Sequence, residues 1–206
     1  MTSLTAIQAL RTPTPSEPLR ILFSACLTGI TCGYDGTAYG EYPALLKILK
    51  SNLVHKVAFC PENESFGTPR ELCDIHGGTG LDVINGNAKV MTASGIDWTE
   101  GMIQASLKML DIARKEQIEL AIMMDISAAC GSQVVYNGNR NAENKQYQIG
   151  AGVCADQLMK NNFLVISQRD FASLEVLYAK IDTTHVIDPT QKDHHETTWY
   201  KSYFKL

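Results

Sequence analysis

Three cysteines of this 206-residue chain each follow an apolar run and sit in a turn of small residues or proline. The turns are Ser24-Ala25-Cys26-Leu27-Thr28-Gly29, Phe59-Cys60-Pro61-Glu62 and Ser127-Ala128-Ala129-Cys130-Gly131-Ser132. Thiolates are soft ligands that suit zinc, copper(I) and iron-sulfur clusters. If the three turns meet in the fold, they form a centre of three thiolates with no obvious fourth ligand.

The choice between these metals depends on that fourth ligand. A zinc site needs one nearby, and none of the five histidines follows the same apolar runs. Three cysteines alone suit an iron-sulfur cluster with one open iron, although tens of residues separate them, unlike the cysteines of a ferredoxin loop. The competing interpretation is that they are ordinary core residues, as most free cysteines are.

Two polar residues lie beside these cysteines in the sequence. Glu62 follows Cys60 across Pro61, and Ser127 comes just before Cys130 in a turn. In a crevice Glu62 is a candidate acid or base, and a tight turn brings the Ser127 hydroxyl to the same centre. Both residues also have ordinary interpretations, as a solvated loop acid and as a turn-capping serine.

The remaining polar candidates have simpler interpretations. Arg70 either reaches an anion in a pocket or pairs with Glu71 or Asp74. His194 and His195 stand among charged residues, which indicates a solvated face.

The other three cysteines lack the placement after an apolar run. Cys32, on the loop after Cys26, could approach the same pocket, whereas Cys73 lies in a polar turn and Cys154 inside a predicted helix. The glycines of Gly150-Ala151-Gly152, just before that helix, suit either an anion site or close helix packing.

Short apolar runs alternate with helical segments along the middle of the chain. Strands are predicted at 21–23, 54–59, 120–124 and 163–166, helices at 43–50, 97–117, 150–161 and 171–181, and a hairpin at 81–90 with Asn85-Gly86 at its tip. This alternation predicts a three-layer, Rossmann-like α/β fold with a mainly parallel sheet and helices on both faces. Ligands of such sheets bind beyond the carboxyl ends of the strands, where Cys26, Cys60 and Cys130 fall.

The chain divides into three parts. Residues 1–19 contain three prolines and no sustained apolar period, so we expect an extended or disordered lead. Residues 20–181 are predicted to form a single α/β catalytic domain, and 45% hydrophobic content is enough for one core. Residues 182–206 form a C-terminal extension whose closing aromatic residues could pack on the domain or on a second copy in a homodimer.

Net charge and the lack of sorting signals limit the classes of partner and the locations that we expect. A formal net charge of -4 argues against a surface for duplex nucleic acid and favours a small molecule. The first seven residues lack the basic and apolar regions of a secretory signal, and no apolar run approaches the ~20 residues of a membrane span. We therefore expect a cytoplasmic protein with reduced thiols and no membrane contact.

The ordered set of motifs resembles the domain-of-unknown-function family 523, whose members include bacterial thiouracil desulfidases. The resemblance runs from about Arg20 to about Asp170 and rests on Ser24-Ala25-Cys26-Leu27-Thr28-Gly29 with Cys32 and Tyr34-Asp35-Gly36, Cys60-Pro61-Glu62, Pro69-Arg70, Gly77-Gly78-Thr79-Gly80 with Asp82-Val83, and Ser127-Ala128-Ala129-Cys130-Gly131. The last motif departs from the common form, Ser-Pro-Ser-Cys-Gly after a lysine-containing strand end. Here Ala128 and Ala129 replace the proline and the second serine, and the motif follows Met123-Met124-Asp125.

The resemblance implies a [4Fe-4S] cluster held by Cys26, Cys60 and Cys130. The unligated iron would bind the sulfur of a small thiolated substrate such as 2-thiouracil, while Glu62 and Ser127 handle protons as water replaces the sulfur. The products would be hydrosulfide and an oxo-base, formed without net redox change. The rival interpretation is a non-catalytic module that binds metal or sulfide, or carries sulfur, in the same crevice.

Overall fold

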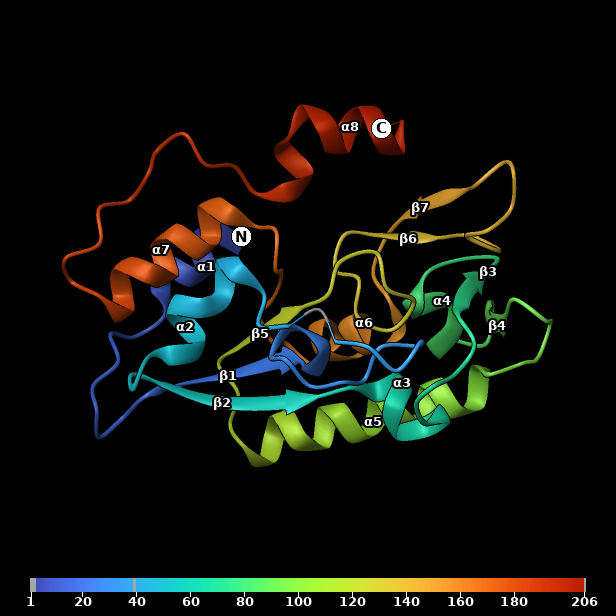
Figure 1. The fold of residues 1–206 in the computed structure, drawn as a ribbon, viewed down its shortest axis with the longest axis horizontal. Helices are drawn as coiled ribbons and strands as arrows, with labels where there is room; N and C mark the ends of the chain where they lie inside the picture. Colours follow the sequence, from blue (N-terminus) through green and yellow to red (C-terminus); the bar gives the residue numbers. More distant parts are fainter. Residues whose placement is uncertain (1–2, 39, 206) are drawn as a thin grey trace.

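The computed structural model describes residues 3–38 and 40–205, and a four-stranded parallel sheet lies at its centre (Figure 1). Its strands are β1 (Leu19–Ser24), β2 (Val54–Phe59), β5 (Leu120–Met123) and β8 (Val165–Ser167), in the order β2-β1-β5-β8. From β1 the chain passes to β2 on one side and later to β5 on the other, so the strand order reverses there. Ligands bind beside such a reversal, at the carboxyl ends of the strands.

Helices cover both faces of this sheet and make it the middle of three layers. One face packs against α1 (Ser3–Ala9), α2 (Leu46–Lys50) with the preceding 3-10 turn Pro43–Leu45, and α7 (Phe171–Ile181); the other packs against α5 (Thr99–Lys115) and α6 (Val153–Lys160). Successive residues of β1 point to opposite faces, so Ile21 and Phe23 join the first layer and Leu22 the second. The predicted three-layer α/β fold is confirmed.

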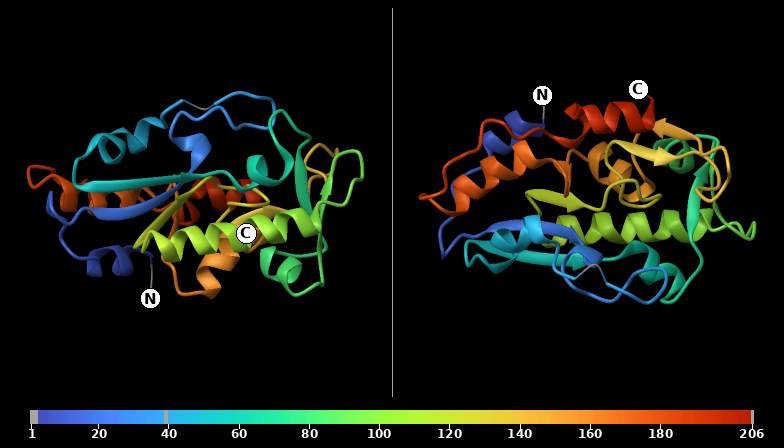
Figure 2. Two further views of the ribbon diagram at one scale, coloured as in Figure 1. Left: turned by 90° about the horizontal axis from the view of Figure 1, so that it is seen from below. Right: turned by 45° about the horizontal axis from the view of Figure 1, so that its top comes forward.

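Two antiparallel ribbons, three short helices and the 3-10 turns Ala25–Leu27 and His194–Glu196 complete the secondary structure of the described residues. The ribbons and helices are β3 (Cys73–His76) with β4 (Lys89–Thr92), β6 (Val134–Tyr136) with β7 (Tyr147–Ile149), α3 (Pro61–Phe66), α4 (Gly80–Ile84) and α8 (Thr198–Phe204). The C-terminal helix α8 lies over the β6-β7 ribbon (Figure 2), where the rings of Tyr147 and Phe204 have centroids 4.8 Å apart. The closing aromatic segment therefore packs on the domain.

The structure corrects the prediction for the N-terminal lead of residues 1–19. Residues 3–9 form helix α1 instead of an extended segment, while residues 1 and 2 lie outside the described residues. The side chain of Ile7 is fully buried in the layer that contains α7. Ile7, the partly buried Leu10 and hydrogen bonds from Lys180 to the carbonyls of Gln8 and Leu10 hold this segment on the domain, and two apolar residues make no sustained apolar period.

The predicted hairpin at residues 81–90 is also wrong. Residues 80–84 form helix α4, which the capping box of Thr79 and Asp82 begins, and only residues 89–92 form a strand. The Asn85-Gly86 pair ends the helix, since the amide of Asn85 donates to the carbonyl of Leu81 and Gly86 adopts φ 78°. An Asn-Gly pair suits a left-handed helix end as well as a hairpin tip, so the local sequence could not separate the two.

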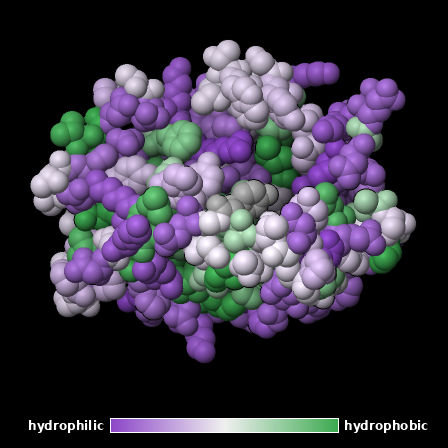
Figure 3. All heavy atoms as spheres, viewed as in Figure 1, coloured by the Kyte–Doolittle hydropathy of each residue, from purple (hydrophilic) through white to green (hydrophobic). Residues whose placement is uncertain are grey.

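The surface seen in Figure 3 is mostly polar, with apolar residues in separate patches. Among the described residues, no helix combines the length and the apolar character that a membrane crossing requires.

Candidate functional site

Three strand ends bring Cys26, Cys60 and Cys130 to the wall of one cavity of about 220 Å³. Cys26 lies in the 3-10 turn directly after β1, Cys60 directly follows β2, and Cys130 lies in the loop after β5. A larger, more open cavity of about 590 Å³ has no cysteine among its lining residues. Because thiols, a carboxylate and guanidinium groups all line the smaller cavity, we take it as the candidate site.

Cys32 and Cys73 also line the cavity. The prediction that Cys73 lies in a polar turn is wrong, because it is the buried first residue of β3. The interaction of the Cys32 thiol with that of Cys26 is the main cause that raises the pKa of Cys32 to about 11. The Cys60 thiol also contacts the carbonyl oxygen of Cys32 at 3.8 Å and accepts from the amide of Asn63 at 3.4 Å. The interaction with the Cys32 thiol, followed by burial, raises the pKa of Cys60. Burial raises the pKa of Cys130.

Several thiols line the cavity, and their soft sulfur ligands fit an iron-sulfur cluster. As the side chains lie, no three His, Cys, Asp or Glu residues within 3–38 and 40–205 converge closely enough to hold one metal ion. A cluster takes its cysteines on different iron atoms, so its ligands can stand around a cavity instead of meeting at a point. The neutral thiols must lose their protons when they become ligands.

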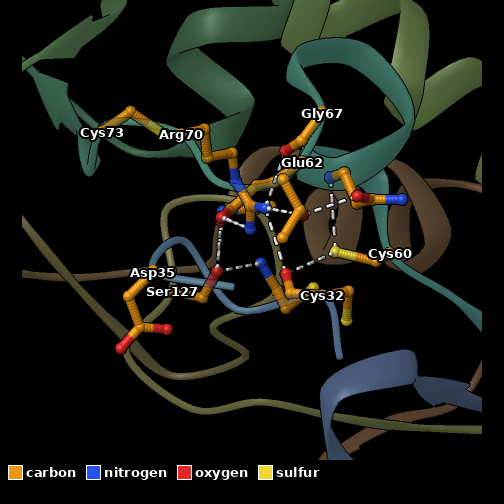
Figure 4. A network of polar contacts seen from close by, with 12 residues as sticks. Cys32, Asp35, Cys60, Glu62, Gly67, Arg70, Cys73 and Ser127 are labelled. Carbon is orange, nitrogen blue, oxygen red and sulfur yellow. Dashed lines mark hydrogen bonds and ion pairs between the residues drawn. The ribbon is translucent and has the colours of Figure 1, made fainter. Parts of the chain in front are cut away.

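A buried arginine and a serine hold the Glu62 carboxylate from two sides (Figure 4). Arg70 donates from Nη2 to Glu62 Oε2 at 2.8 Å, and Ser127 Oγ lies 3.2 Å from Glu62 Oε1. The side chains of Arg70 and Glu62 are 4% and 21% exposed, which makes this a partly desolvated ion pair. The structure thus brings Glu62 and Ser127 together, as expected, and pairs Arg70 with Glu62 instead of Glu71 or Asp74.

Arg70 connects several loops around the site. Its Nη1 donates to the carbonyl oxygens of Cys32 at 3.0 Å and Gly67 at 3.1 Å, and to Thr68 Oγ1 at 3.0 Å. Its backbone amide donates to the carbonyl of Tyr34 at 2.7 Å. A planar guanidinium held at this many points gives the carboxylate of Glu62 a defined position.

The hydroxyl of Ser127 can donate its hydrogen bond only to Glu62, because both of its lone pairs are occupied. Its oxygen accepts hydrogen bonds from the amides of Ala129 at 3.2 Å and Cys130 at 3.1 Å. A serine hydroxyl carries one proton and two lone pairs, so the proton is left for the Glu62 carboxylate. Ser127 therefore both caps the turn that holds Cys130 and offers its proton to Glu62.

Further residues that line the cavity escaped the sequence analysis. They include Asp125, Tyr136 and Arg140. Asp125 stands directly after the apolar run of β5, so a carboxylate at the end of a predicted parallel strand was an available signal. Arg140 comes from the β6-β7 connection and pairs with Asp74 at 2.6 Å. The two residues are far apart in the chain, so no local sequence pattern predicts this contact.

The structure corrects the prediction that His194 lies on a solvated face. Its side chain is 6% exposed, and its Nδ1 lies 2.5 Å from Oδ2 of Asp125. The adjacent His195 is exposed, as expected. Their charged neighbours in the sequence predicted that both side chains face solvent. His194 instead pairs with the buried Asp125.

The turn Gly150-Ala151-Gly152 serves close packing and not anion binding. The first amides of α6 are already occupied, because Val153 donates to the carbonyl of Ala128 and Cys154 to that of Ala129, each at 2.9 Å. A Cβ atom on Gly152 would lie 2.6 Å from the carbonyl oxygens of Ser127 and Ala128. The start of α6 thus packs directly on the backbone of the turn that carries Ser127 and Cys130.

Gly152→Ala should therefore destabilise the protein by about 3 kcal/mol, at the upper end for overpacking, since backbone atoms cannot swing aside. Urea unfolding measures the loss. Gly86→Ala is the contrasting control, because nothing lies within 4 Å of its added Cβ and only its φ of 78° is unfavourable. There the expected loss is about 1 kcal/mol. Equal losses in the two variants would contradict the close packing on the Ser127 turn.

Comparison with known proteins gives three similarities. The sequence model of a family described as 2-thiouracil desulfurase matches residues 21–170. The uncharacterized protein YbbK of Bacillus subtilis (strain 168) is 40% identical over 151 residues, which are 73% of this chain and 96% of that protein. A solved structure of the [4Fe-4S]-dependent thiouracil desulfidase TudS has a TM-score of 0.64 and 27% identity, covering 78% of this chain and 98% of that one. All the residues that line the candidate cavity fall within the family match.

Proposed function

Because the chain belongs to the 2-thiouracil desulfurase family, we propose that it removes the sulfur of a thiolated nucleobase and releases it as hydrosulfide. The family match and the similarity to TudS confirm the resemblance to family 523. The observation that carries the proposal is the meeting of three cysteines with the Glu62–Ser127 pair in one cavity. The family match alone does not say which residues would perform the reaction, whereas the cavity brings candidate residues together.

Cys26, Cys60 and Cys130 would hold a [4Fe-4S] cluster, the cofactor named for TudS. When bound, the cluster would supply an open iron that acts as a Lewis acid toward the substrate sulfur. Each of the three cysteines follows a different strand of one parallel sheet, so the fold itself orients them. Thiolate ligands require reduced cysteines, which agrees with the cytoplasm as the proposed location.

Glu62 and Ser127 would manage the protons of the reaction. The carbon-sulfur double bond of the substrate is exchanged for a carbon-oxygen double bond, with the oxygen and two protons coming from water. Glu62 Oε1 can take a proton from the attacking water and return it to the leaving sulfur, while the hydrogen bond donated by Ser127 Oγ holds this oxygen in place. Arg70 keeps the carboxylate oriented during both transfers.

The walls of the cavity also offer groups that could orient a base. Tyr136 presents a hydroxyl and Arg140 a guanidinium. A pyrimidine carries N–H donors and carbonyl acceptors in one plane, which such groups can recognise. No charged group of the substrate is needed for this arrangement.

Turnover under anaerobic conditions tests the proposal. The protein is loaded with iron and sulfide, supplied with 2-thiouracil, and assayed for hydrosulfide and uracil over time. Many equivalents of both products per chain are expected. One equivalent or less would favour the carrier alternative, and a failure to take up iron would contradict the cluster itself.

A further inference from the structure

We propose that residues 193–205 form a strap that positions the Ser127 loop, which we define as residues 124–131. The strap contains the 3-10 turn His194–Glu196 and helix α8, and it lies outside the family match of residues 21–170. It contacts Asp125 and Ile126, the two residues that precede Ser127. The loop that carries a proposed proton donor is thus held by a segment that the family match does not include.

The first contact is the buried pair of His194 and Asp125. Nδ1 of His194 lies 2.5 Å from Asp125 Oδ2, and the two side chains are 6% and 1% exposed. The other carboxylate oxygen, Oδ1, accepts from the amide of Ile126 at 3.0 Å. A carboxylate buried this deeply needs partners for both oxygens, and the strap supplies one of them.

The second contact supports a strained residue. Ile126 adopts φ 60°, in the left-handed region that branched side chains rarely occupy. Its side chain packs against a cluster formed by Val134 and by Tyr200 and Phe204 of α8. Strained backbone persists where the surroundings hold it, and here much of that support comes from the strap.

The strap is anchored independently of Asp125. The amide of His194 donates to Asp170 Oδ1 at 3.0 Å, and the Asp193 carboxylate accepts from the amide and the hydroxyl of Ser173 at 2.8 Å each. The ring of Trp199 stacks on His194 with centroids 5.4 Å apart. His194 is therefore already held in place when it meets Asp125, which is the requirement for a positioning residue.

His194 acts through another residue, since it is absent from the cavity wall whereas Asp125 and Ser127 line it. Movement of Asp125 or Ile126 would change the 3.2 Å contact between Ser127 and Glu62. The role in proton transfer rests on the proposed function, but the effect of the strap on the loop does not.

Hydrogen exchange of the ligand-free, full-length protein tests the strap. His194→Ala should speed exchange in the peptide 124–131 by about tenfold, because a local opening becomes easier. Amides of β1 and α5 should be unaffected. His194→Asn should restore much of the protection, since its amide nitrogen can donate from nearly the position of Nδ1. His195→Ala is the matched control, at an exposed neighbour, and should change nothing in the loop.

Unchanged exchange in residues 124–131 of His194→Ala, or an equal change in His195→Ala, would overturn the proposal. If His194→Ala does not fold, Trp199→Ala removes a half-exposed ring that stacks on His194 and should give a smaller rise in the same peptide. No rise there would also overturn it.

In the iron-loaded enzyme, His194→Ala should lower kcat about tenfold with little change in KM, as expected when a reacting group is misplaced. This second measurement separates the two proposals. If the wild-type protein turns over no thiolated base while the exchange results hold, the proposed function fails and the strap stands.

Discussion

Cys26→Ala, Cys60→Ala and Cys130→Ala should each reduce the iron bound after anaerobic reconstitution from about four atoms per chain to near zero. Each removes one of three protein ligands, and two thiolates do not retain a cluster that three were needed to hold. All three positions line the same cavity, at the ends of three different strands. Iron and acid-labile sulfide analysis, with the visible absorbance of the cluster, measures the loss.

Two further cysteines serve as controls for this prediction. Cys154 is fully buried in α6 and does not line the cavity, so Cys154→Ala should keep its iron. Cys32 is the sharper control, because it lines the same cavity and its carbonyl oxygen contacts the Cys60 thiol. We expect Cys32→Ala to retain the iron. Loss of iron there, with full iron in any one of the three ligand variants, would reassign the ligands.

Glu62→Gln should lower kcat by about 10²- to 10⁴-fold while the iron content stays unchanged, as for the loss of a general acid-base group. The substitution keeps the size of the side chain and its contact with Ser127, but an amide cannot take up a proton. Hydrosulfide release by iron-loaded protein measures the effect. Retained activity would exclude the proposed role of Glu62.

The control for Glu62 lies on the same short helix. Glu64 is exposed and pairs with Lys108, so Glu64→Gln should leave activity and iron unchanged. Thermal unfolding of both variants is needed, because Glu62→Gln leaves the buried guanidinium of Arg70 without its counter-charge. Removing one partner of a buried pair is itself destabilising. A loss of iron together with activity would indicate that Glu62 supports the structure of the site instead of the chemistry.

The parts of this site that could be predicted from sequence are those that the parallel sheet determines. Apolar runs of strand length identified β1, β2 and β5, and residues just after such strands meet at one edge of the sheet. Cys26, Cys60 and Cys130 could therefore be placed together without any knowledge of the loops. Glu62 and Ser127 were found because they are close to two of these cysteines in the chain.

Contacts between distant polar residues were beyond such reasoning. Asp125 and His194 are 69 positions apart, and their pairing depends on how α7 and the strap fold back over the sheet. Periodicity describes which face of an element is buried but carries no information on which charged groups meet. For the same reason Arg70 was paired with its neighbours in the sequence, whereas the fold presents Glu62 to it.

The strand order β2-β1-β5 also has a thermodynamic consequence. A ligand held by Cys26, Cys60 and Cys130 would join the ends of three neighbouring strands, so none of them could separate while it stayed bound. Binding to the folded state alone raises its stability by mass action, in proportion to the logarithm of ligand concentration over the dissociation constant. The melting temperature would then report occupancy of the site, and these three strands would resist unfolding as one unit.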